Sequence, residues 1–336
     1  MKINSDSDNQ KLVSIVIPSK NSGEDITRIF NSLSKQTFKD FEVVFVDSKS
    51  NASQKIHRII KEFSSKLKIK YFLEDNLLPG EARNIGVLNC SYDLIAFLDT
   101  KTIPSKEWLA TAVLALKEKK VDVIFGSFKS SAETKFQKYV KYATYGYEAH
   151  RSLPGSLILR EAFEITGPFL SLRAGEDIEW INRAINALRH SDSVAGILTY
   201  EGLPKSAFQL VKKWYSYSIE SAKVDIVTAQ KTAYFLLAIA LIGYFFFTYN
   251  YFFAGSSWDQ SPYFIPHINK ILWATFLLIY FVFRSIIKPV SVGVKFNQLF
   301  PFSWVGIGIV GLQIDIAKMP GRIFGFITFV GRRLFK

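Results

Sequence analysis

Three carboxylates mark a candidate site for chemistry. Asp99 ends the apolar run Leu94–Leu98, which has the composition of a buried strand. Glu176 and Asp177 follow Gly175 at the start of a stretch with a helical pattern, where the helix dipole favours negative charge. Because ligands of open α/β sheets bind at the carboxyl ends of the strands, we expect these acids to converge there. Such a site could hold a phosphorylated donor and activate an acceptor.

Further polar residues follow two other expected strands. Asp47 ends one apolar run, and Pro18 and Asn21 lie at the end of another. A carboxylate at the end of a strand can accept hydrogen bonds from a base or a ribose, so we assign these residues to donor binding. The alternative is that Asp47 or Asp99 only caps the next helix.

Arg83 lies in the segment Gly80–Gly86, in an early turn of an expected helix that faces the same edge of the sheet. An arginine in this position can contact a phosphate group through two parallel hydrogen bonds. The alternative is a surface salt bridge. The chain has no Gly-x-Gly-x-x-Gly after a strand and no Gly-x-x-x-x-Gly-Lys-Ser/Thr, so neither a dinucleotide fingerprint nor a P-loop is present.

Asp177 is the best candidate for a general base, because it needs only to approach an acceptor hydroxyl and take its proton. Glu176 stands beside it, and Trp180 and Arg183 could line the same pocket. The alternative is that both acids only stabilise the start of the helix. The four histidines are scattered, and no pair has the spacing of metal ligands.

Apolar runs alternate with helix-like stretches over the first part of the chain. The runs cover residues 12–18, 41–47, 68–73, 92–99 and 121–126, and the helix-like stretches cover residues 24–36, 52–65, 80–89 and 105–119. This alternation predicts an α/β fold with a mainly parallel, twisted sheet. Because the runs are apolar on both faces, helices are expected on both faces of the sheet.

Charge and composition divide the chain into two parts. The 336 residues carry a net charge of +13, and residues 232–336 hold only nine Lys and Arg and two Asp and Glu. Residues 1–230 are therefore expected to form the α/β domain and residues 231–336 a membrane region. Cys90 is the only cysteine, which excludes an intramolecular disulfide and fits a reducing compartment.

Two stretches of the C-terminal part are long enough to cross a bilayer. Residues 232–253 carry no charge, and residues 271–287 reach the length of a span if Arg284 extends its charge to the surface. The loop of residues 250–269 lacks Lys and Arg, whereas basic residues follow the second span, so both ends of the chain are expected on the cytoplasmic side. A third element near residues 300–317 is therefore expected to be re-entrant or interfacial. The alternative for residues 232–331 is a buried helical core.

The order of these segments resembles a membrane-anchored member of the family 2 glycosyltransferases, which have a GT-A fold. The segments that carry the resemblance are Ser14–Asn21, Val44–Ser50, Gly80–Gly86, Leu98–Lys101, Gly155–Arg160, Gly167–Phe169 and Gly175–Asp177 with Arg183. The resemblance covers about residues 12–215. It implies donor binding by Pro18, Asn21, Asp47, Arg83, Asp99 and Lys101, and an acceptor side formed by Gly155, Ser156, Trp180 and Arg183.

The chain departs from the family pattern next to Asp99. The family usually has a second acid two residues later, which binds the divalent metal ion that bridges the donor diphosphate, and here that residue is Lys101. Asp99 is then the one remaining candidate ligand for Mg²⁺ or Mn²⁺. We expect Lys101 to supply positive charge to the diphosphate instead. Residues 209–214 match the motif of processive synthases only loosely, so processive synthesis is not expected.

The resemblance implies an inverting glycosyltransferase of the hexosyltransferase type, which transfers a sugar from a nucleotide diphosphate sugar to a lipid-linked or membrane-proximal glycan. Its place would be polysaccharide or glycolipid synthesis at the cell membrane, with several spans and a cytoplasmic catalytic domain. The alternative is a non-catalytic membrane-bound partner protein with a degenerate metal site. A transport protein is disfavoured because the expected spans lack buried charges. No nucleic acid is expected as a partner.

Overall fold

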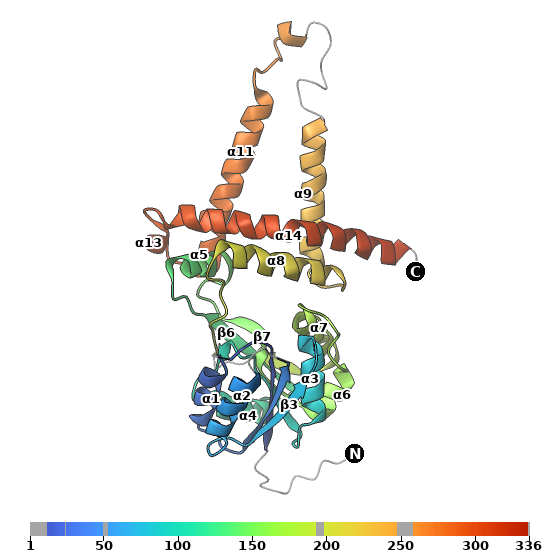
Figure 1. Cartoon of the computed structure of the whole chain (residues 1–336). Helices are drawn as coiled ribbons and strands as arrows, with labels where there is room; N and C mark the ends of the chain where they lie inside the picture. Colours follow the sequence, from blue (N-terminus) through green and yellow to red (C-terminus); the bar gives the residue numbers. More distant parts are fainter. Residues whose placement is uncertain (1–11, 24, 50–52, 193–197, 247–257, 335–336) are drawn as a thin grey trace. The chain divides into compact units, whose positions relative to one another are not determined.

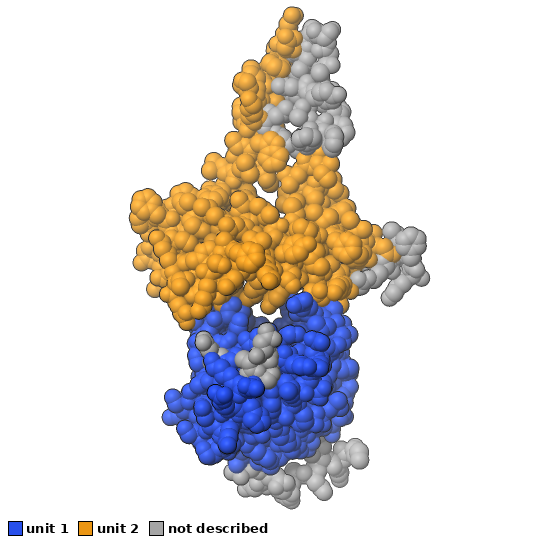
Figure 2. Space-filling view, viewed as in Figure 1, with its two compact units in different colours: residues 1–131, 149–202 blue, residues 132–148, 203–336 orange. Residues whose placement is uncertain are grey.

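The computed structural model describes residues 12–23, 25–49, 53–192, 198–246 and 258–334. The chain divides into two compact units, one formed by residues 1–131 and 149–202 and the other by residues 132–148 and 203–336 (Figure 2). Residues 132–148 and 203–230, which the composition assigned to the α/β domain, thus belong to the unit that contains the C-terminal helices.

The first unit is built on one sheet whose strands run in both directions. Its strands are β1 (Val13–Ser19), β2 (Phe41–Ser48), β3 (Ile69–Glu74), β4 (Leu94–Phe97), β5 (Thr102–Ile103), β6 (Val123–Ser130), β7 (His150–Leu159), β8 (His190–Asp192) and β9 (Leu198–Tyr200). The order is β3-β2-β1-β4-β7-β6-β9-β5, with β8 paired to β6. β3, β2, β1 and β4 are parallel, whereas β7 is antiparallel to both of its neighbours. The α/β class is confirmed, and the sheet is mixed.

Helices cover both faces of this sheet, as predicted. They are α1 (Asp25–Ser34), α2 (Ser53–Phe63), α3 (Pro79–Leu88), α4 (Trp108–Lys119), α6 (Arg160–Thr166) and α7 (Glu176–Ala187) (Figure 1). Successive residues of a strand point to opposite faces, so Ile15 and Ile17 join a core with α1, α2 and α4, while Val16 joins a second core with α3, α6 and α7. These two cores fix the strand ends that carry the polar residues of the predicted site.

The second unit is helical. It contains α5 (Lys135–Thr144), α8 (Ala207–Ala222), α9 (Thr228–Phe246), α11 (Ile268–Val282), α12 (Lys288–Ser291), α13 (Phe296–Leu299) and α14 (Ser303–Leu334), with a 3₁₀ turn at Trp258–Gln260 and a π-helical turn, η2, at Phe283–Ile287. Within this unit α8 lies along α14, and α9 and α11 rise steeply from that pair (Figure 1).

The predicted membrane elements are partly reproduced as helices. Among the described residues, one helix, 270–291, is long and apolar enough to cross a membrane, and residues 228–243 form a shorter apolar helix. The predicted first span, 232–253, extends beyond residue 246, outside the described residues. The third element, expected near residues 300–317 to be re-entrant or interfacial, lies within α14, which is one helix of 32 residues.

Arg284 does not extend its charge to a surface, and this expectation was wrong. Its Nε lies 2.8 Å from Oδ2 of Asp315 on α14, and both side chains are largely buried. The hydroxyl groups of Tyr234 and Tyr280 donate hydrogen bonds to the same carboxylate at 2.7 and 2.8 Å. The C-terminal helices therefore enclose an ion pair, contrary to the expectation that their spans lack buried charges.

Candidate active site

Arg83 joins the acidic residues that the sequence placed at one edge of the sheet. Its Nη1 donates to Oε1 of Glu176 at 2.6 Å, and its Nη2 donates to Oδ1 of Asp99 at 2.8 Å. The arginine side chain is only 4% exposed. It comes from the first turns of α3, and its partners come from the end of β4 and the start of α7. We call these three residues the Arg83 cluster.

Two glycines allow the three elements to meet. A Cβ atom on Gly80, at the start of α3, would lie 2.4 Å from the carbonyl oxygen of Leu170, so only glycine permits this approach. Gly175 precedes α7 with a φ of +88°, a conformation that glycine adopts without strain. The close approach of backbone segments, rather than the charges alone, thus brings Glu176 to Arg83.

Within the acidic pair, the two carboxylates occupy different positions. Glu176 is 5% exposed and bound to Arg83, whereas Asp177 is half-buried and its Oδ1 accepts a hydrogen bond from the backbone N–H of Ile178 at 2.8 Å. Burial raises the pKa of Asp177; the charge of Arg83 opposes this effect and the charge of Asp99 reinforces it. A carboxylate with a raised pKa is better suited to accept a proton. Burial raises the pKa of Glu176 as well, so the contact with Arg83 and the smaller exposure of Glu176 distinguish the two carboxylates. Asp177 is the better candidate for the base, and Glu176 holds Arg83.

Arg83 does not offer its guanidinium to a phosphate group in this structure. Both of its terminal nitrogens are bound to carboxylates, and its Nε is buried without a hydrogen-bond partner. In this arrangement Arg83 positions the carboxylates of Glu176 and Asp99, and its contact with a phosphate group stays a prediction. The alternative of a surface salt bridge is also excluded, because the arginine is buried.

The turn after Asp99 presents Lys101 to solvent. Oγ1 of Thr102 donates to the carbonyl oxygen of Asp99 at 2.7 Å and accepts from its backbone N–H at 3.1 Å, which closes the turn. The carbonyl oxygen of Lys101 accepts a hydrogen bond from the N–H of Glu201 at 2.9 Å. Lys101 therefore has a fixed backbone and an exposed side chain beside Asp99.

The loop after β1 is attached to this turn by residues that the sequence analysis missed. Oγ1 of Thr100 donates to Oγ of Ser22 at 3.0 Å, and both side chains are buried. Asn21, next to Ser22, is exposed and has a φ of +55°, and Pro18 is half-buried at the end of β1. The available signal was their position beside assigned site residues, since Thr100 lies between Asp99 and Lys101 and Ser22 follows Asn21.

Asp47 lies at the end of β2, opposite Ser19 in the register of the parallel pair. Its side chain is fully buried, and Oδ2 accepts a hydrogen bond from the hydroxyl of Tyr71 at 3.4 Å. Burial and the charge of Asp47 raise the pKa of Tyr71 to about 12, so this hydroxyl stays protonated and donates. The structure thus places Asp47 at the expected strand end with its carboxylate covered.

Gly155 and Ser156, assigned to the acceptor side, shape the β6–β7 pair. The carbonyl oxygen of Gly155 accepts from Nε1 of Trp108 at 3.0 Å, and a Cβ atom there would lie 2.3 Å from Leu198. Oγ of Ser156 accepts from the N–H of Gly126 at 2.9 Å and is fully buried. As side-chain contacts to an acceptor, these two assignments are corrected, because packing and backbone bonds use both residues.

The same correction applies to Trp180 and Arg183 on α7. Trp180 is completely buried, and its Nε1 donates to the carbonyl oxygen of Gly167 at 2.9 Å. Arg183 donates to the carbonyl oxygens of Thr166 and Pro168 and pairs with Glu179 at 2.7 Å. Both side chains thus hold the loop at residues 166–168 in place.

The comparisons with known proteins match the part of the chain that carries most of this site. Residues 14–172 match the model of the family described as Glycosyl transferase family 2. The matched segment contains Asp47, Arg83, Asp99 and Lys101 and ends before α7. The resemblance read from the sequence motifs is confirmed at the level of this domain.

Three curated relatives share parts of the sequence. Glycosyltransferase AglE of Haloferax volcanii is 27% identical over 189 residues, 52% of this chain and 62% of its own. Amylovoran biosynthesis glycosyltransferase AmsB of Erwinia amylovora is 39% identical over 88 residues, 26% of this chain and 29% of its own. Poly(ribitol-phosphate) beta-N-acetylglucosaminyltransferase TarS of Staphylococcus aureus is 33% identical over 120 residues, 34% of this chain and 21% of its own. In each case the match spans less than two thirds of the relative.

Several solved structures have a similar course of the chain. One is residues 1–349 of S. aureus TarS in complex with UDP-GlcNAc. Its TM-score is 0.46, and it is 18% identical over 95% of this chain and 92% of that chain. Another is the mannosyltransferase PcManGT from Pyrobaculum calidifontis in complex with GDP-Man and Mn²⁺, with a TM-score of 0.48 and 15% identity over 94% of this chain and 86% of that chain.

The Arg83 cluster predicts a large loss of stability when the arginine is removed. Arg83→Ala would leave two carboxylates without their buried cation, which typically costs about 3–5 kcal/mol. Urea unfolding of the purified full chain, followed by tryptophan fluorescence, measures the effect. Arg28→Ala is the matched control, because Arg28 also pairs with two carboxylates, Asp25 and Glu201, but is 48% exposed.

Loss of the exposed pairs in Arg28→Ala should cost less than about 1 kcal/mol. The loss of free energy of unfolding in Arg83→Ala should become smaller as the pH falls, because the carboxylates that lack Arg83 then become protonated. Equal losses in the two variants at neutral pH would contradict a stabilising role of the Arg83 cluster.

Proposed function

We propose that this chain is an inverting glycosyltransferase that uses a nucleotide diphosphate sugar as its donor. The observation that carries the proposal is the Arg83 cluster, which ties the turn with Asp99 and Lys101, inside the segment that matches family 2, to the acidic start of α7. The relatives named above are glycosyltransferases, which supports a sugar as the transferred group. The proposed class is a hexosyltransferase of polysaccharide or glycolipid synthesis.

In the proposed reaction, Asp177 takes the proton of the acceptor hydroxyl as its oxygen attacks the anomeric carbon of the donor. The bond between that carbon and the diphosphate oxygen breaks, and the nucleoside diphosphate leaves with the electron pair. The raised pKa of Asp177 makes its carboxylate a better proton acceptor at neutral pH. The exposed ammonium group of Lys101 stabilises the negative charge that develops on the leaving diphosphate.

The residues around Asp99 do not fit a metal ion held by the protein alone. In the part of the chain that the structure describes, no three His, Cys, Asp or Glu side chains are grouped to hold one. Oδ1 of Asp99 is bound to Arg83, and a cation stands two residues away at Lys101. We therefore assign no step of the reaction to Mg²⁺ or Mn²⁺.

The helical unit supports a membrane location for the enzyme. Large apolar side chains are exposed along its two steep helices, namely Leu236, Ile239 and Ile242 of α9 and Ile271, Leu272, Phe276, Leu277, Leu278 and Ile279 of α11. Apolar patches of this extent on a protein surface mark an interaction site. We propose that lipid covers them, with α9 and α11 crossing the cell membrane and the catalytic domain in the cytoplasm.

α14 supports an interfacial position in the same proposal. Its exposed apolar side chains recur at intervals of three, four or eight residues, which places them on one face of the helix. They are Val305, Ile309, Leu312, Ile316, Phe324 and Ile327. A long helix with one exposed apolar face and basic residues elsewhere fits the plane of the membrane interface. An acceptor carried by a lipid would then reach the enzyme from this side.

The assigned base predicts the effect of Asp177→Asn. The variant should lower kcat by about 10²–10⁴-fold and leave the KM for the donor nearly unchanged, because the amide keeps the shape but not the basicity. In the unaltered enzyme kcat/KM should fall as the pH drops through the raised pKa of Asp177, above the ordinary value of about 3.9.

This fall of kcat/KM at low pH should be absent from the residual activity of Asp177→Asn. Initial rates of sugar transfer by detergent-solubilised enzyme, after a screen of nucleotide sugars, provide the measurement. Glu161→Gln, at an exposed position of α6, is the control and should change neither parameter. Wild-type turnover in Asp177→Asn would refute the assignment of Asp177 as the general base. If no nucleotide sugar is bound or used, the alternative of a non-catalytic partner protein is favoured.

The position of Lys101 predicts how the enzyme responds to metal removal. Activity should survive EDTA and should fall sharply in Lys101→Ala, because the ammonium group supplies the charge at the diphosphate. Lys106→Ala, at another exposed lysine after the same strand, should retain activity. Complete loss of activity in EDTA that added Mg²⁺ or Mn²⁺ restores would overturn the assigned role of Lys101.

The membrane proposal predicts that Gln260, between α9 and α11, and Lys117, on α4, lie on opposite sides of the membrane. Single cysteines at these positions, in a Cys90→Ala background, can be labelled with a membrane-impermeant maleimide. Gln260→Cys should react in intact cells and Lys117→Cys only after permeabilisation. Labelling of both from the same side would exclude the two-span arrangement.

A further inference from the structure

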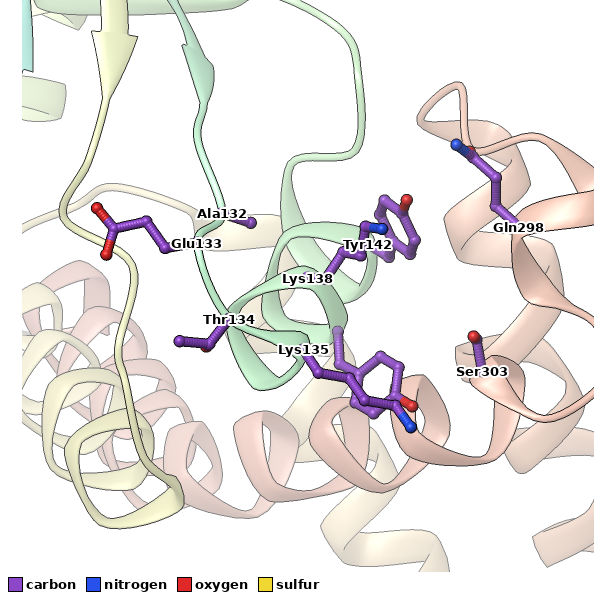
Figure 3. Close-up of a pocket in the computed structure, with 9 residues that line it drawn as sticks. Ala132, Glu133, Thr134, Lys135, Lys138, Tyr142, Gln298 and Ser303 are labelled. Carbon is purple, nitrogen blue, oxygen red and sulfur yellow. The ribbon is translucent and has the colours of Figure 1, made fainter.

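The helical unit contains a cavity that the proposed reaction does not use. Its volume is about 480 Å³, within the range of sites for small ligands. Glu133, Lys135, Lys138 and Tyr142, from α5 and the segment before it, line one side, and Gln298 of α13 and Ser303 of α14 line the other (Figure 3). All of these residues belong to the second unit, so the cavity lies within one compact part of the chain.

The wall of the cavity is built by close packing. Tyr139, which also lines the cavity, lies against Gly306, where a Cβ atom would come within 2.3 Å of the tyrosine ring. The glycine thus allows α5 to approach the first turn of α14. Tyr142 is almost completely buried, its hydroxyl shares a 2.8 Å hydrogen bond with that of Tyr147, and Gln298 donates to the same Tyr147 oxygen at 2.9 Å. These contacts give the cavity a fixed polar wall.

The cavity is positively charged. Lys135 and Lys138 lie one helical turn apart on the same face of α5, and within the described residues neither forms an ion pair. The one acidic side chain of the lining, Glu133, lies 3.7 Å from Lys205. Ser303 begins α14, and the first turn of a helix carries partial positive charge. The pKa of Tyr147 is lowered against the effect of burial, by its hydrogen bonds and by Lys141 and Lys138.

Exposed aromatic residues lie next to the lining residues in the sequence, and they favour a lipid over a soluble anion as the ligand. Phe296, Phe300 and Phe302 flank Gln298 and Ser303 in the sequence, and they are 63%, 40% and 79% exposed. Phe296 and Phe300 lie with their ring centroids 4.7 Å apart. A soluble phosphate would leave these rings exposed to water, whereas an acyl chain attached to a phosphate would cover them.

We propose that this cavity binds the phosphate headgroup of an anionic phospholipid, with Lys135 and Lys138 on the phosphate and the three phenylalanines along the acyl chain. The proposal rests on the membrane location proposed above, and it adds a specific lipid to it. The site would fix α5 and the start of α14 to the headgroup layer of the bilayer. It is independent of the sugar-transfer chemistry, because none of its residues belongs to the Arg83 cluster or its surroundings.

The test is binding of dioctanoyl phosphatidic acid to the purified full chain in non-ionic detergent, measured by titration calorimetry without a sugar donor. Dioctanoyl phosphatidylcholine and inorganic phosphate are titrated in parallel. The double variant Lys135→Gln/Lys138→Gln removes both charges. Lys117→Gln/Lys120→Gln is the matched control, because it removes two exposed lysines with the same spacing at the end of α4. A thermal unfolding curve checks that each variant is folded.

We expect saturable binding of phosphatidic acid that is weakened at least about tenfold in Lys135→Gln/Lys138→Gln and unchanged in the control, since charge-assisted hydrogen bonds are the strong ones. Equal affinity for phosphatidylcholine, or equal weakening in the control, would overturn the site. If inorganic phosphate binds as tightly as phosphatidic acid and competes with it, the ligand is a free phosphate and the lipid assignment is wrong. Because no transfer is measured, these outcomes do not depend on the proposed activity.

Discussion

The structure of the candidate site depends on one buried guanidinium. Arg83 is the point at which α3, the end of β4 and the start of α7 meet, and each of its terminal nitrogens holds one carboxylate. Transferring such charges from water to the interior is costly, and a buried ion pair is often no more stable than apolar residues of similar volume. Its value here is geometric, because the two bonds fix where Asp177 stands relative to the turn that carries Asp99 and Lys101.

The sequence was a good guide to the parts of the fold that have local patterns. Each of the five apolar runs overlaps a strand, and the four helix-like stretches overlap α1 to α4. The antiparallel strand β7 was not expected, because its run contains Pro154 and Gly155 and the alternation with helices stops before it. Whether a strand runs parallel or antiparallel depends on the strand it pairs with, and its own sequence does not specify that partner.

The roles of the side chains at the site could be predicted only in part. Trp180 and Arg183 were assigned to a pocket because they follow the acidic pair, yet Trp180, Ile181 and Ala184 lie on the buried face of α7. This spacing was visible in the sequence and pointed to the core. The roles of Ser22 and Thr100 could not be read in the same way, since their hydrogen bond joins two loops that are 78 residues apart. Likewise, Arg284 and Asp315 resemble two isolated charges until folding brings them together.

The carboxylate of Asp315 has a consequence for the order in which the helical unit can form. It accepts hydrogen bonds from tyrosines on α9 and α11 and pairs with the arginine of η2, so these three elements all bind one carboxylate of α14. All three partners precede Asp315 in the chain and leave the ribosome earlier. During synthesis their polar groups must therefore be satisfied by water or by neighbouring groups until α14 arrives. The exchange of these temporary partners for the carboxylate of Asp315 can therefore follow only after the segment of α14 that carries Asp315 has been made.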